Sequence, residues 1–179
     1  MIGKSVIVLI LAFSAAIATA VPAKAFRITS SAFAEGAGVP GRFTCDGKNV
    51  PPALAWENVP KRAKSLVLIV EDPDAPSGLF VHWVLFNMSP ARKGLPEGFG
   101  PVVGDRIKNE VLVNGGNGTG KTGYTGPCPP SGTHRYTFRL LALDSALFLK
   151  PGATRAQVLQ AAHGHVVAEC ALMGKYKRK

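Results

Sequence analysis

The sequence has few acidic residues for its content of basic ones. It holds 11 Asp and Glu against 21 Lys and Arg, so the 179-residue chain has a formal net charge of +10 at pH 7. Such a charge favours contact with anionic lipid headgroups, polyanions or acidic partners. Yet the basic residues are scattered, apart from a cluster at 175–179, and the chain lacks the arginine-rich helix and aromatic pattern of RNA-binding modules. We therefore expect no nucleic-acid binding, and we interpret the cluster as a solvated tail.

Cysteine is also scarce, and its spacing excludes two kinds of site. Cys45, Cys128 and Cys170 form no C-x-x-C pair, so the sequence predicts neither a zinc finger nor a thioredoxin-type redox centre. In an oxidising compartment, one disulfide and one buried thiol is the simplest arrangement. The spacing does not decide which two cysteines pair.

Two catalytic patterns are missing as well. The chain has no G-x-S-x-G nucleophile elbow, which argues against a Ser–His–Asp hydrolase even though Ser131 lies near His134. The only H-x-H spacing, at His163 and His165, falls at the end of a predicted helix and outside the other candidate residues. We therefore predict no metal site and no cofactor.

The N-terminus has the three parts of a secretory signal peptide. A short basic start precedes an almost wholly apolar stretch, Val6 to Ala18, and small-residue sites that end at Ala20 and Ala25 follow it. The apolar stretch is short for a membrane-spanning helix, which needs about 20 residues. We predict a signal peptide over 1–25, with cleavage after Ala20 as the alternative, and a single exported domain, periplasmic or secreted, over 26–179.

The remaining sequence is mostly β. Apolar, branched runs alternate with turns rich in glycine and proline, without repeats or low-complexity linkers, which favours an antiparallel two-sheet sandwich. Residues 154–162 are the only convincing helix, with Thr154 as N-cap and Gly164 as the stop. The run at 165–172 could extend this helix, but we favour a strand. The other predicted strands are 26–29, 42–45, 65–72, 81–88 and 134–144.

One stretch points to a different function. Gly115–Thr122, with the sequence GGNGTGKT, fits the P-loop pattern G-x-x-x-x-G-K-[ST]. A P-loop must open a helix, because the helix N-terminus supplies donors to the phosphates. Here three prolines and three glycines follow before residue 133, and a proline inside a helix costs about 3 kcal/mol. We therefore interpret the match as a glycine-rich surface loop.

Polar residues gather around two of the predicted strands. Asp72 and Asp74 stand on a turn, DPDAP, that its prolines stiffen. His82 stands inside an apolar strand. Alternation predicts that His82 shares one face with Val84 and Phe86, opposite Val81, Trp83 and Leu85.

A third polar segment begins the strand at 134–144. His134 and Tyr136 are two residues apart and share a face, while Arg135 points away. Together with the histidine and aspartates above, they could line one cavity at a sheet end. Such a cavity would bind an anion through His N–H, Tyr O–H and loop donors, with an aspartate fixing a histidine tautomer.

These motifs resemble the phosphatidylethanolamine-binding proteins, specifically their bacterial branch, often called Raf kinase inhibitor-like proteins. DPDAP followed by a His-Trp strand and then by GPCPP…HRY is specific in this order. FTCDGKNVPPALAWENVP at 43–60 and HVVAECALMGKY at 165–176 extend the resemblance over essentially the whole chain after residue 25. The resemblance implies a sandwich of antiparallel sheets with one or two short helices and a small anion pocket at one end.

The resemblance also implies the pocket residues and the state of the cysteines. Cys170 stands where this branch often has a small non-thiol residue, which would leave Cys45 and Cys128 as the pair. The ligand-binding positions of the family fall on Asp72, His82, Gly126, Pro127, His134 and Tyr136, with Asp74 and Pro76 shaping the adjoining turn.

The sequence departs from the family in two places. Its approach to GPCPP, at 110–126, is longer and richer in glycine than usual, which would alter the pocket rim. The chain also has no room for the long C-terminal helix of the animal members, so their kinase regulation is not expected here. Similar bacterial proteins are thought to form dimers, and a homodimer is therefore one further expectation.

The sequence thus predicts an exported, non-enzymatic binding protein for a small anion, either a phospholipid headgroup or a metabolite. The alternative is a protein-interaction module that inhibits or modulates a kinase or protease, for which the loop at 114–125 would matter most. A weak hydrolase that uses Asp and His as acid and base is a third interpretation.

Overall fold

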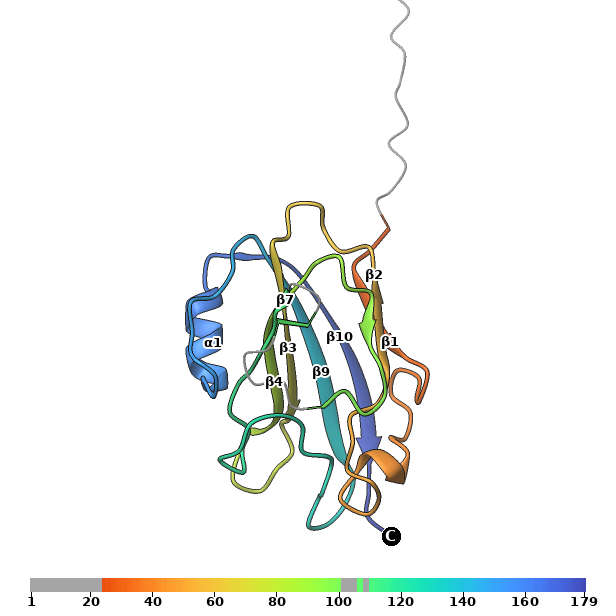
Figure 1. Cartoon of the computed structure of the whole chain (residues 1–179). Helices are drawn as coiled ribbons and strands as arrows, with labels where there is room; N and C mark the ends of the chain where they lie inside the picture. The colour runs from red at the N-terminus through yellow and green to blue at the C-terminus, as the bar shows by residue number, and fades with distance from the viewer. Residues whose placement is uncertain (1–23, 101–105, 108–109) are drawn as a thin grey trace, which may run out of the picture.

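Figure 1 shows the computed structural model, which describes residues 24–100, 106–107 and 110–179. The predicted signal peptide therefore lies almost wholly outside the described residues. No helix in the described part is long and apolar enough to cross a membrane. The elements in chain order are β1 (Arg27–Ser30), η1 (Gly41–Phe43), β2 (Leu54–Glu57), β3 (Ser65–Asp72), β4 (Phe80–Met88), β5 (Gly94–Leu95), β6 (Arg106–Ile107), β7 (Glu110–Val111), β8 (Val113–Asn114), β9 (His134–Leu143), α1 (Arg155–Ala162) and β10 (Val166–Tyr176).

Two antiparallel sheets form the sandwich that the sequence predicts. The large sheet has the order β10-β9-β3-β4-β8, and the small sheet has the order β1-β2-β5. β6 and β7 pair only with each other. In Figure 1 the small sheet lies on one side of the large sheet, and α1 lies on the other. The large sheet is therefore covered on both faces.

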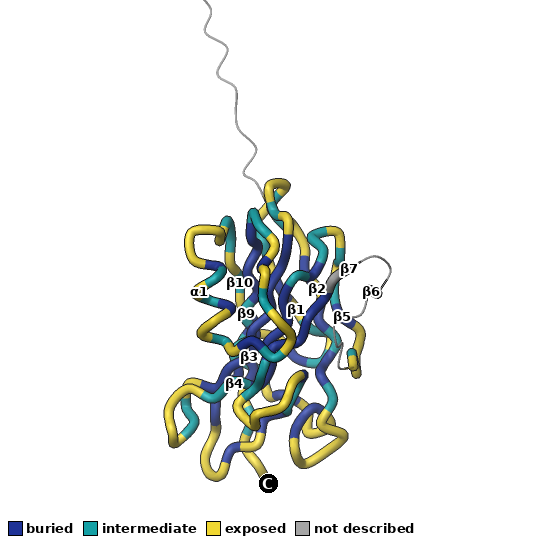
Figure 2. The backbone as a smooth tube through the Cα atoms, turned by 60° about the vertical axis from the view of Figure 1, so that its left-hand side comes forward, coloured by how far each residue is buried: buried dark blue, intermediate teal, exposed yellow. Residues whose placement is uncertain are grey.

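β3 is the centre of the large sheet and is buried along its whole length. Leu66, Leu68 and Val70 pack into the core between the two sheets, whereas Val67 and Ile69 pack into a second core under α1. Figure 2 shows this strand as part of the buried centre of the molecule. A strand with two buried faces needs apolar side chains at successive positions, which explains its continuous apolar run.

α1 begins and ends as its sequence predicts. The Thr154 side chain accepts a hydrogen bond from the Gln157 backbone N–H, and the Gln157 side chain accepts one from the Thr154 N–H, which completes a capping box. Val158 and Ala162 are buried in the core beneath the helix. Gly164 then adopts φ +80°, a value that suits glycine. The chain continues into β10, which confirms the strand that we favoured over a longer helix.

Two features of the β structure were not predicted correctly. The strand expected at 42–45 is wrong, because local hydrogen bonds replace a ladder: Phe43 N–H donates to the Pro40 carbonyl and Thr44 N–H to the Gly41 carbonyl. The sequence analysis also missed β2, β5, β6, β7 and β8. β2 has only four residues and the others only two each, which is too short for a clear alternating pattern.

Candidate functional site

The predicted pocket residues meet at one end of the large sheet, the lower end in Figure 1, where β3 ends and β4 and β9 begin. Because β3 pairs with both neighbours, these three strand ends lie side by side. A cavity of about 390 Å³ opens at this end. Of the pocket and turn residues predicted from the sequence, the following line this cavity: Asp72, Pro76, His82, Gly126 and His134.

Asp72 and His134 form a buried polar pair. Asp72 Oδ2 lies 2.7 Å from His134 Nδ1, and the two residues are only 3% and 7% exposed. The other carboxylate oxygen, Oδ1, accepts the Asp74 N–H at 2.8 Å. A carboxylate accepts hydrogen bonds, so His134 carries a proton on Nδ1 and its tautomer is fixed. This is the role that the sequence analysis expected for an aspartate.

The predicted alternation in β4 is wrong at the start of the strand. Val70 on β3 pairs with Trp83, but the next residue, Glu71, pairs with Val81. His82 is therefore an extra residue in the register, as in a β-bulge, and such a bulge re-aims a side chain. His82 lies away from the α1 face of the sheet, on which the structure places Val81, Val84 and Phe86.

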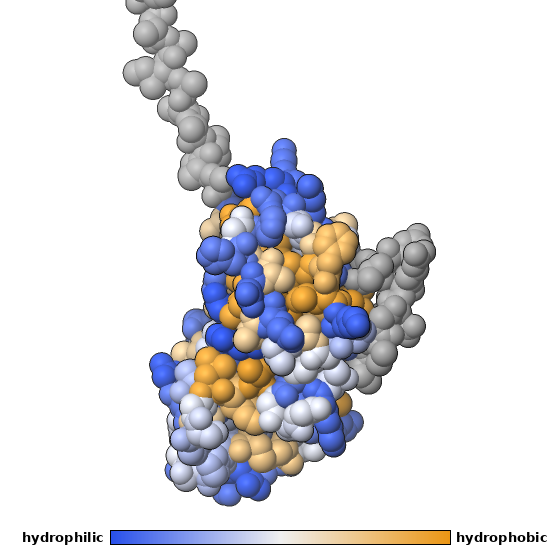
Figure 3. Space-filling model, turned by 90° about the vertical axis from the view of Figure 1, so that its left-hand side faces the viewer, coloured by the Kyte–Doolittle hydropathy of each residue, from blue (hydrophilic) through white to orange (hydrophobic). Residues whose placement is uncertain are grey.

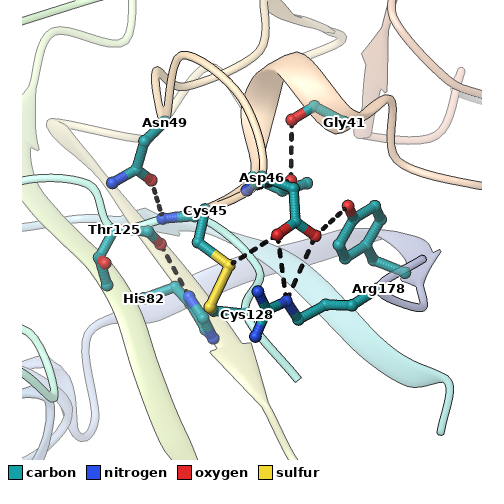
Figure 4. The surroundings of a disulfide bond; sticks show 11 residues. Gly41, Cys45, Asp46, Asn49, His82, Thr125, Cys128 and Arg178 are labelled. Atoms are coloured by element: carbon teal, nitrogen blue, oxygen red, sulfur yellow. Dashed lines mark hydrogen bonds and ion pairs between the residues drawn. A yellow bond between two sulfur atoms is a disulfide. The ribbon is translucent and has the colours of Figure 1, made fainter. Parts of the chain in front are cut away.

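His82 sits between aromatic rings and a loop carbonyl. Its ring centroid lies 4.8 Å from that of Phe80 and 5.1 Å from that of Tyr136. Its Nδ1 donates to the Thr125 carbonyl oxygen at 2.7 Å (Figure 4). Burial lowers the pKa of His82 below its ordinary value. The second ring nitrogen, Nε2, is buried and has no hydrogen-bond partner among the described residues.

Tyr136 places a second buried polar atom next to the site. The residue is fully buried, it does not line the cavity, and its ring lies edge-on to the ring of His82. Its Oη has no hydrogen bond of normal geometry within the described part of the chain, but the Asp72 carboxylate lies close enough to act on it as an acceptor. Burial raises the pKa of Tyr136, and the nearby Asp72 carboxylate raises it further. Buried polar atoms are rarely left unpaired in proteins, so the unpaired Nε2 of His82 needs an explanation.

A disulfide forms one wall of the cavity. Cys45 and Cys128 are bonded, with Cα atoms 5.4 Å apart, and both line the cavity (Figure 4). The Cys45 N–H also donates to the Pro127 carbonyl at 3.0 Å. This pairing is the one that the family resemblance implied, and it leaves Cys170 as a free, half-buried thiol. Pro127 thus holds the rim together but does not line the cavity itself.

Asn49 is a rim residue that sequence reasoning missed. The backbone N–H of Gly126 donates to Asn49 Oδ1 at 2.7 Å, so this N–H is used within the protein (Figure 4). Asn49 has φ +55°, a left-handed conformation that asparagine tolerates better than most residues. Its position in the turn DGKN was the available indication, but the partner lies 77 residues away.

Replacing Asn49 by glycine is expected to destabilise the rim. Glycine accepts the positive φ but leaves the buried Gly126 N–H without an acceptor, which costs about 1–3 kcal/mol of unfolding free energy. Asn58 is a matched control, because it also has a positive φ, and its side chain bonds only an exposed carbonyl, that of Ala25. Asn58→Gly should change stability by less than about 0.5 kcal/mol. Urea denaturation of both variants checks this, and equal losses would contradict a special role for Asn49.

Asp74 is occupied by a neighbour outside the cavity. Its carboxylate accepts three hydrogen bonds from Arg135: from the backbone N–H at 2.8 Å, from Nε at 2.9 Å and from Nη2 at 2.6 Å. These bonds lower the pKa of Asp74 to about 2. Asp74 therefore shapes the turn, as expected, and is committed to Arg135. No group of three or more His, Cys, Asp or Glu residues within the described ranges is placed to hold a metal ion.

The P-loop-like stretch forms a closed turn. Asn117 Oδ1 accepts hydrogen bonds from the Thr119 N–H at 2.9 Å and the Thr119 hydroxyl at 2.6 Å, and the Asn117 N–H donates to the Lys121 carbonyl at 2.7 Å. Gly116 and Thr122 form an isolated bridge, and no helix begins between this loop and α1. The loop therefore lacks the helix N-terminus that a phosphate-binding P-loop uses.

A larger groove lies at the opposite end of the sheet. It has a volume of about 970 Å³, and Leu147 and the 97% exposed Phe148 are among its walls. Figure 3 shows the face that bears α1, where hydrophobic patches lie among hydrophilic ones. Two polar side chains in the groove already have partners: Asn87 bonds both the N–H and the carbonyl of Leu147, and Ser65 bonds the Ser145 carbonyl. Size alone does not make it the better candidate for a polar ligand.

The fold and this site define a class of protein: an antiparallel sandwich with a polar cavity at one end of its large sheet. The family profile described as phosphatidylethanolamine-binding protein matches residues 29–177. The chain belongs to this family, as its motifs indicated.

Related proteins match this chain over most of its length. A UPF0098 protein of Methanothermobacter thermautotrophicus is 50% identical over 152 residues, which cover 85% of this chain and 99% of that protein. The phosphatidylethanolamine-binding protein homologue CT736 of Chlamydia trachomatis has a similar crystal structure, with a TM-score of 0.79 and 41% identity, covering 87% of this chain and 99% of that one. E. coli YbcL, described as a member of the mammalian family, has a TM-score of 0.75 and 28% identity, covering 86% and 99%.

Proposed function

We propose that this chain is an exported, non-enzymatic binding protein that holds a small anionic group, such as phosphate or a phosphoethanolamine headgroup. One observation carries the proposal: Asp72, His82 and His134 line one cavity where β3, β4 and β9 meet. The Nε2 atom of His82 is buried and has no partner among the described residues. Because an unpaired buried polar group costs free energy, a polar ligand that pairs with this atom would be stabilised there.

The size of the cavity supports a headgroup or metabolite as the ligand. Its volume of about 390 Å³ is near the lower limit of small-molecule pockets, which is about 300 Å³. The walls would enclose the polar head of a phospholipid and leave its chains outside. The name of the family agrees with a headgroup ligand.

Two features support export. The predicted signal peptide at 1–25 has the layout of a secreted protein. The Cys45–Cys128 disulfide would also persist in an oxidising compartment and is rare in reducing ones. We include no catalytic activity in the proposal, because the sequence has no nucleophile elbow.

His134→Ala is expected to weaken anion binding without unfolding the domain. The side chain lines the cavity and is paired with Asp72, so its loss removes one polar contact and leaves the buried Asp72 carboxylate without that partner. His165→Ala is a matched control, because His165 Nδ1 also bonds an aspartate, Asp144, but lies 48% exposed outside the cavity. A ligand present at about 100 times its Kd stabilises the native state by about 2.7 kcal/mol. For a domain of this size that is a rise in Tm of roughly 5–10 °C.

Thermal unfolding with phosphate, phosphoethanolamine and acetate measures this effect. We expect Tm to rise for the unaltered protein and for His165→Ala, and to rise much less for folded His134→Ala. The same rise in both variants would contradict the site. No rise with any anion would contradict the proposed function and would favour the protein-interaction module.

A further inference from the structure

The end of the large sheet opposite the cavity is strongly basic. Three segments form it, at 58–65, 87–93 and 145–150, and we call them the basic end. They supply most of the lining of the groove of about 970 Å³. They hold no Asp or Glu, and their basic residues are Lys61, Arg62, Lys64, Arg92, Lys93 and Lys150. Such a concentration of positive charge favours an anionic partner.

The four lysines of the basic end are exposed, and none of them makes an ion pair with another described residue. Two acidic residues that flank this end are occupied by other groups. Glu57 accepts a hydrogen bond from Arg27 Nε at 2.9 Å, and Asp144 Oδ1 lies 2.9 Å from His165 Nδ1. The lysine charges therefore face solvent, and at an anionic lipid surface each lysine strengthens binding by about fivefold.

An exposed aromatic side chain belongs to the same end. Phe148 is 97% exposed, although its chain neighbour Leu147 is buried in the core beneath α1. Asn87 bonds both the N–H and the carbonyl of Leu147, so the backbone that carries Phe148 is anchored. An exposed ring among lysines suits the interface of an anionic bilayer, where the ring enters the headgroup region and the lysines contact phosphates.

The chain also enters the domain at this end. The Ala25 carbonyl accepts a hydrogen bond from Asn58, which belongs to the first of the three segments. Only residues 19–24 separate Ala25 from the apolar stretch of the predicted signal peptide, which ends at Ala18. A chain of this length spans about 20 Å at most. A signal peptide that occupies the membrane during export would therefore keep the basic end close to the membrane surface.

We propose that the basic end is a docking surface for an anionic lipid bilayer, with Phe148 in the headgroup region and the lysines around it on lipid phosphates. A second copy of this chain fits less well, because a two-fold interface would bring the same lysines against one another. An acidic protein would also match the lysines, but the entry of the chain at this end favours a membrane.

Docking by the basic end leaves the cavity remote from the bilayer. β3 begins at Ser65, in the wall of the groove, and ends at Asp72, in the wall of the cavity. A strand of eight residues spans roughly 25 Å. The cavity would then open away from the membrane on which the domain rests. Docking is therefore independent of whether the cavity binds an anion.

Cosedimentation with vesicles tests the inference on the exported protein, free of its signal peptide. Vesicles of phosphatidylcholine provide a neutral surface, and vesicles of phosphatidylcholine and phosphatidylglycerol in equal parts provide an anionic one. At about 25 mM salt we expect binding to the anionic vesicles to be at least about tenfold tighter than to the neutral ones. It should weaken at least about tenfold at about 500 mM salt, because salt screens the lysines. Equal binding to both vesicles, or binding to neither, would overturn the inference.

Two double variants test which basic surface is used. Lys64→Gln with Lys150→Gln removes two charges at the groove and should weaken binding to anionic vesicles by about 25-fold. Lys177→Gln with Lys179→Gln is the matched control, because these lysines follow β10 at the cavity end, where Tyr176 pairs with His134. The control should bind within about threefold of the unaltered protein. Equal losses in the two double variants would show that the basic end is not the docking surface.

A tryptophan at position 148 reports contact with lipid directly. Trp56 and Trp83 are only 3% and 1% exposed, so quenchers carried on lipid chains do not reach them. We expect vesicle binding to quench the fluorescence of Phe148→Trp and to shift its emission to shorter wavelength. Leu79→Trp is the control, because Leu79 is 46% exposed and directly precedes β4 at the cavity end. Quenching at position 79 but not at position 148 would place the membrane at the other end.

Soluble phosphoethanolamine separates this surface from the cavity. At matched ionic strength, an excess of it should leave vesicle binding unchanged, because the groove and the cavity lie at opposite ends of β3. Competition would mean that lipid is held at the cavity, and the inference would be wrong even if the proposed function were right.

Discussion

Replacing Cys45 and Cys128 together by serine is expected to lower the free energy of unfolding by about 2–5 kcal/mol. The disulfide joins residues 83 apart in sequence, so reduction frees a long loop in the unfolded chain. A loop of this length is near the upper end of the stabilisation that chain entropy predicts, about 4–5 kcal/mol. Chemical denaturation of the variant against the oxidised protein measures the difference.

The same change should also weaken anion binding, because both cysteines line the cavity. Without the bond, only hydrogen bonds such as that from the Cys45 N–H to the Pro127 carbonyl hold that wall in place. Cys170→Ser is the matched control, because this free thiol does not line the cavity. Burial raises its pKa to about 12, so it stays protonated. Its variant should keep stability within about 1 kcal/mol and bind phosphate normally. If both serine variants lost the same stability, the disulfide would not be the cause.

Local chemistry explains what the sequence predicted well. The β3 run is continuous and apolar because both of its faces are buried, and this pattern can be read without knowing its neighbours. The capping box of α1 lies within four residues of sequence, from Thr154 to Gln157. The Asp72 turn and the face shared by His134 and Tyr136 follow from proline stiffness and strand alternation.

Non-local contacts explain what the sequence did not predict. The place of His82 depends on a register shift between β3 and β4, and no property of the β4 sequence alone reveals that shift. Asn49 acquires its role only when the loop containing Gly126 folds against it. The cysteine pairing came from the family resemblance, since spacing left it open.

The cavity therefore depends on segments that meet from far apart in the chain. β3, β4 and β9 supply the polar side chains, while the segment around Phe43 and the loop at Gly126 close the wall. The wall is tight because four contacts coincide there: the disulfide, the Cys45–Pro127 backbone bond, the Asn49–Gly126 bond, and the Tyr124 hydroxyl donating to the Phe43 carbonyl at 2.7 Å. A side chain at the point of closest approach would disturb all of them.

Gly126→Ala is accordingly expected to damage both stability and binding. A Cβ at this position would overlap the Phe43 carbonyl oxygen and lie 2.9 Å from Thr44 Cα and 2.7 Å from Asn49 Oδ1. Two of these atoms are backbone, and the neighbouring disulfide ties the segment down, so neither side moves easily. Overpacking of this kind costs about 1–3 kcal/mol, occasionally more. Because the displaced wall lines the cavity, phosphate affinity should fall by at least about tenfold.

Gly38→Ala provides the matched control for this prediction. A Cβ at Gly38 meets no atom within 4 Å, and the residue is exposed. The same substitution there should change stability by less than about 0.5 kcal/mol and leave phosphate binding unaltered. Urea denaturation and calorimetric titration of the two alanine variants measure both effects. If Gly126→Ala matched Gly38→Ala in both measurements, the close approach of the two segments would not be what shapes the cavity.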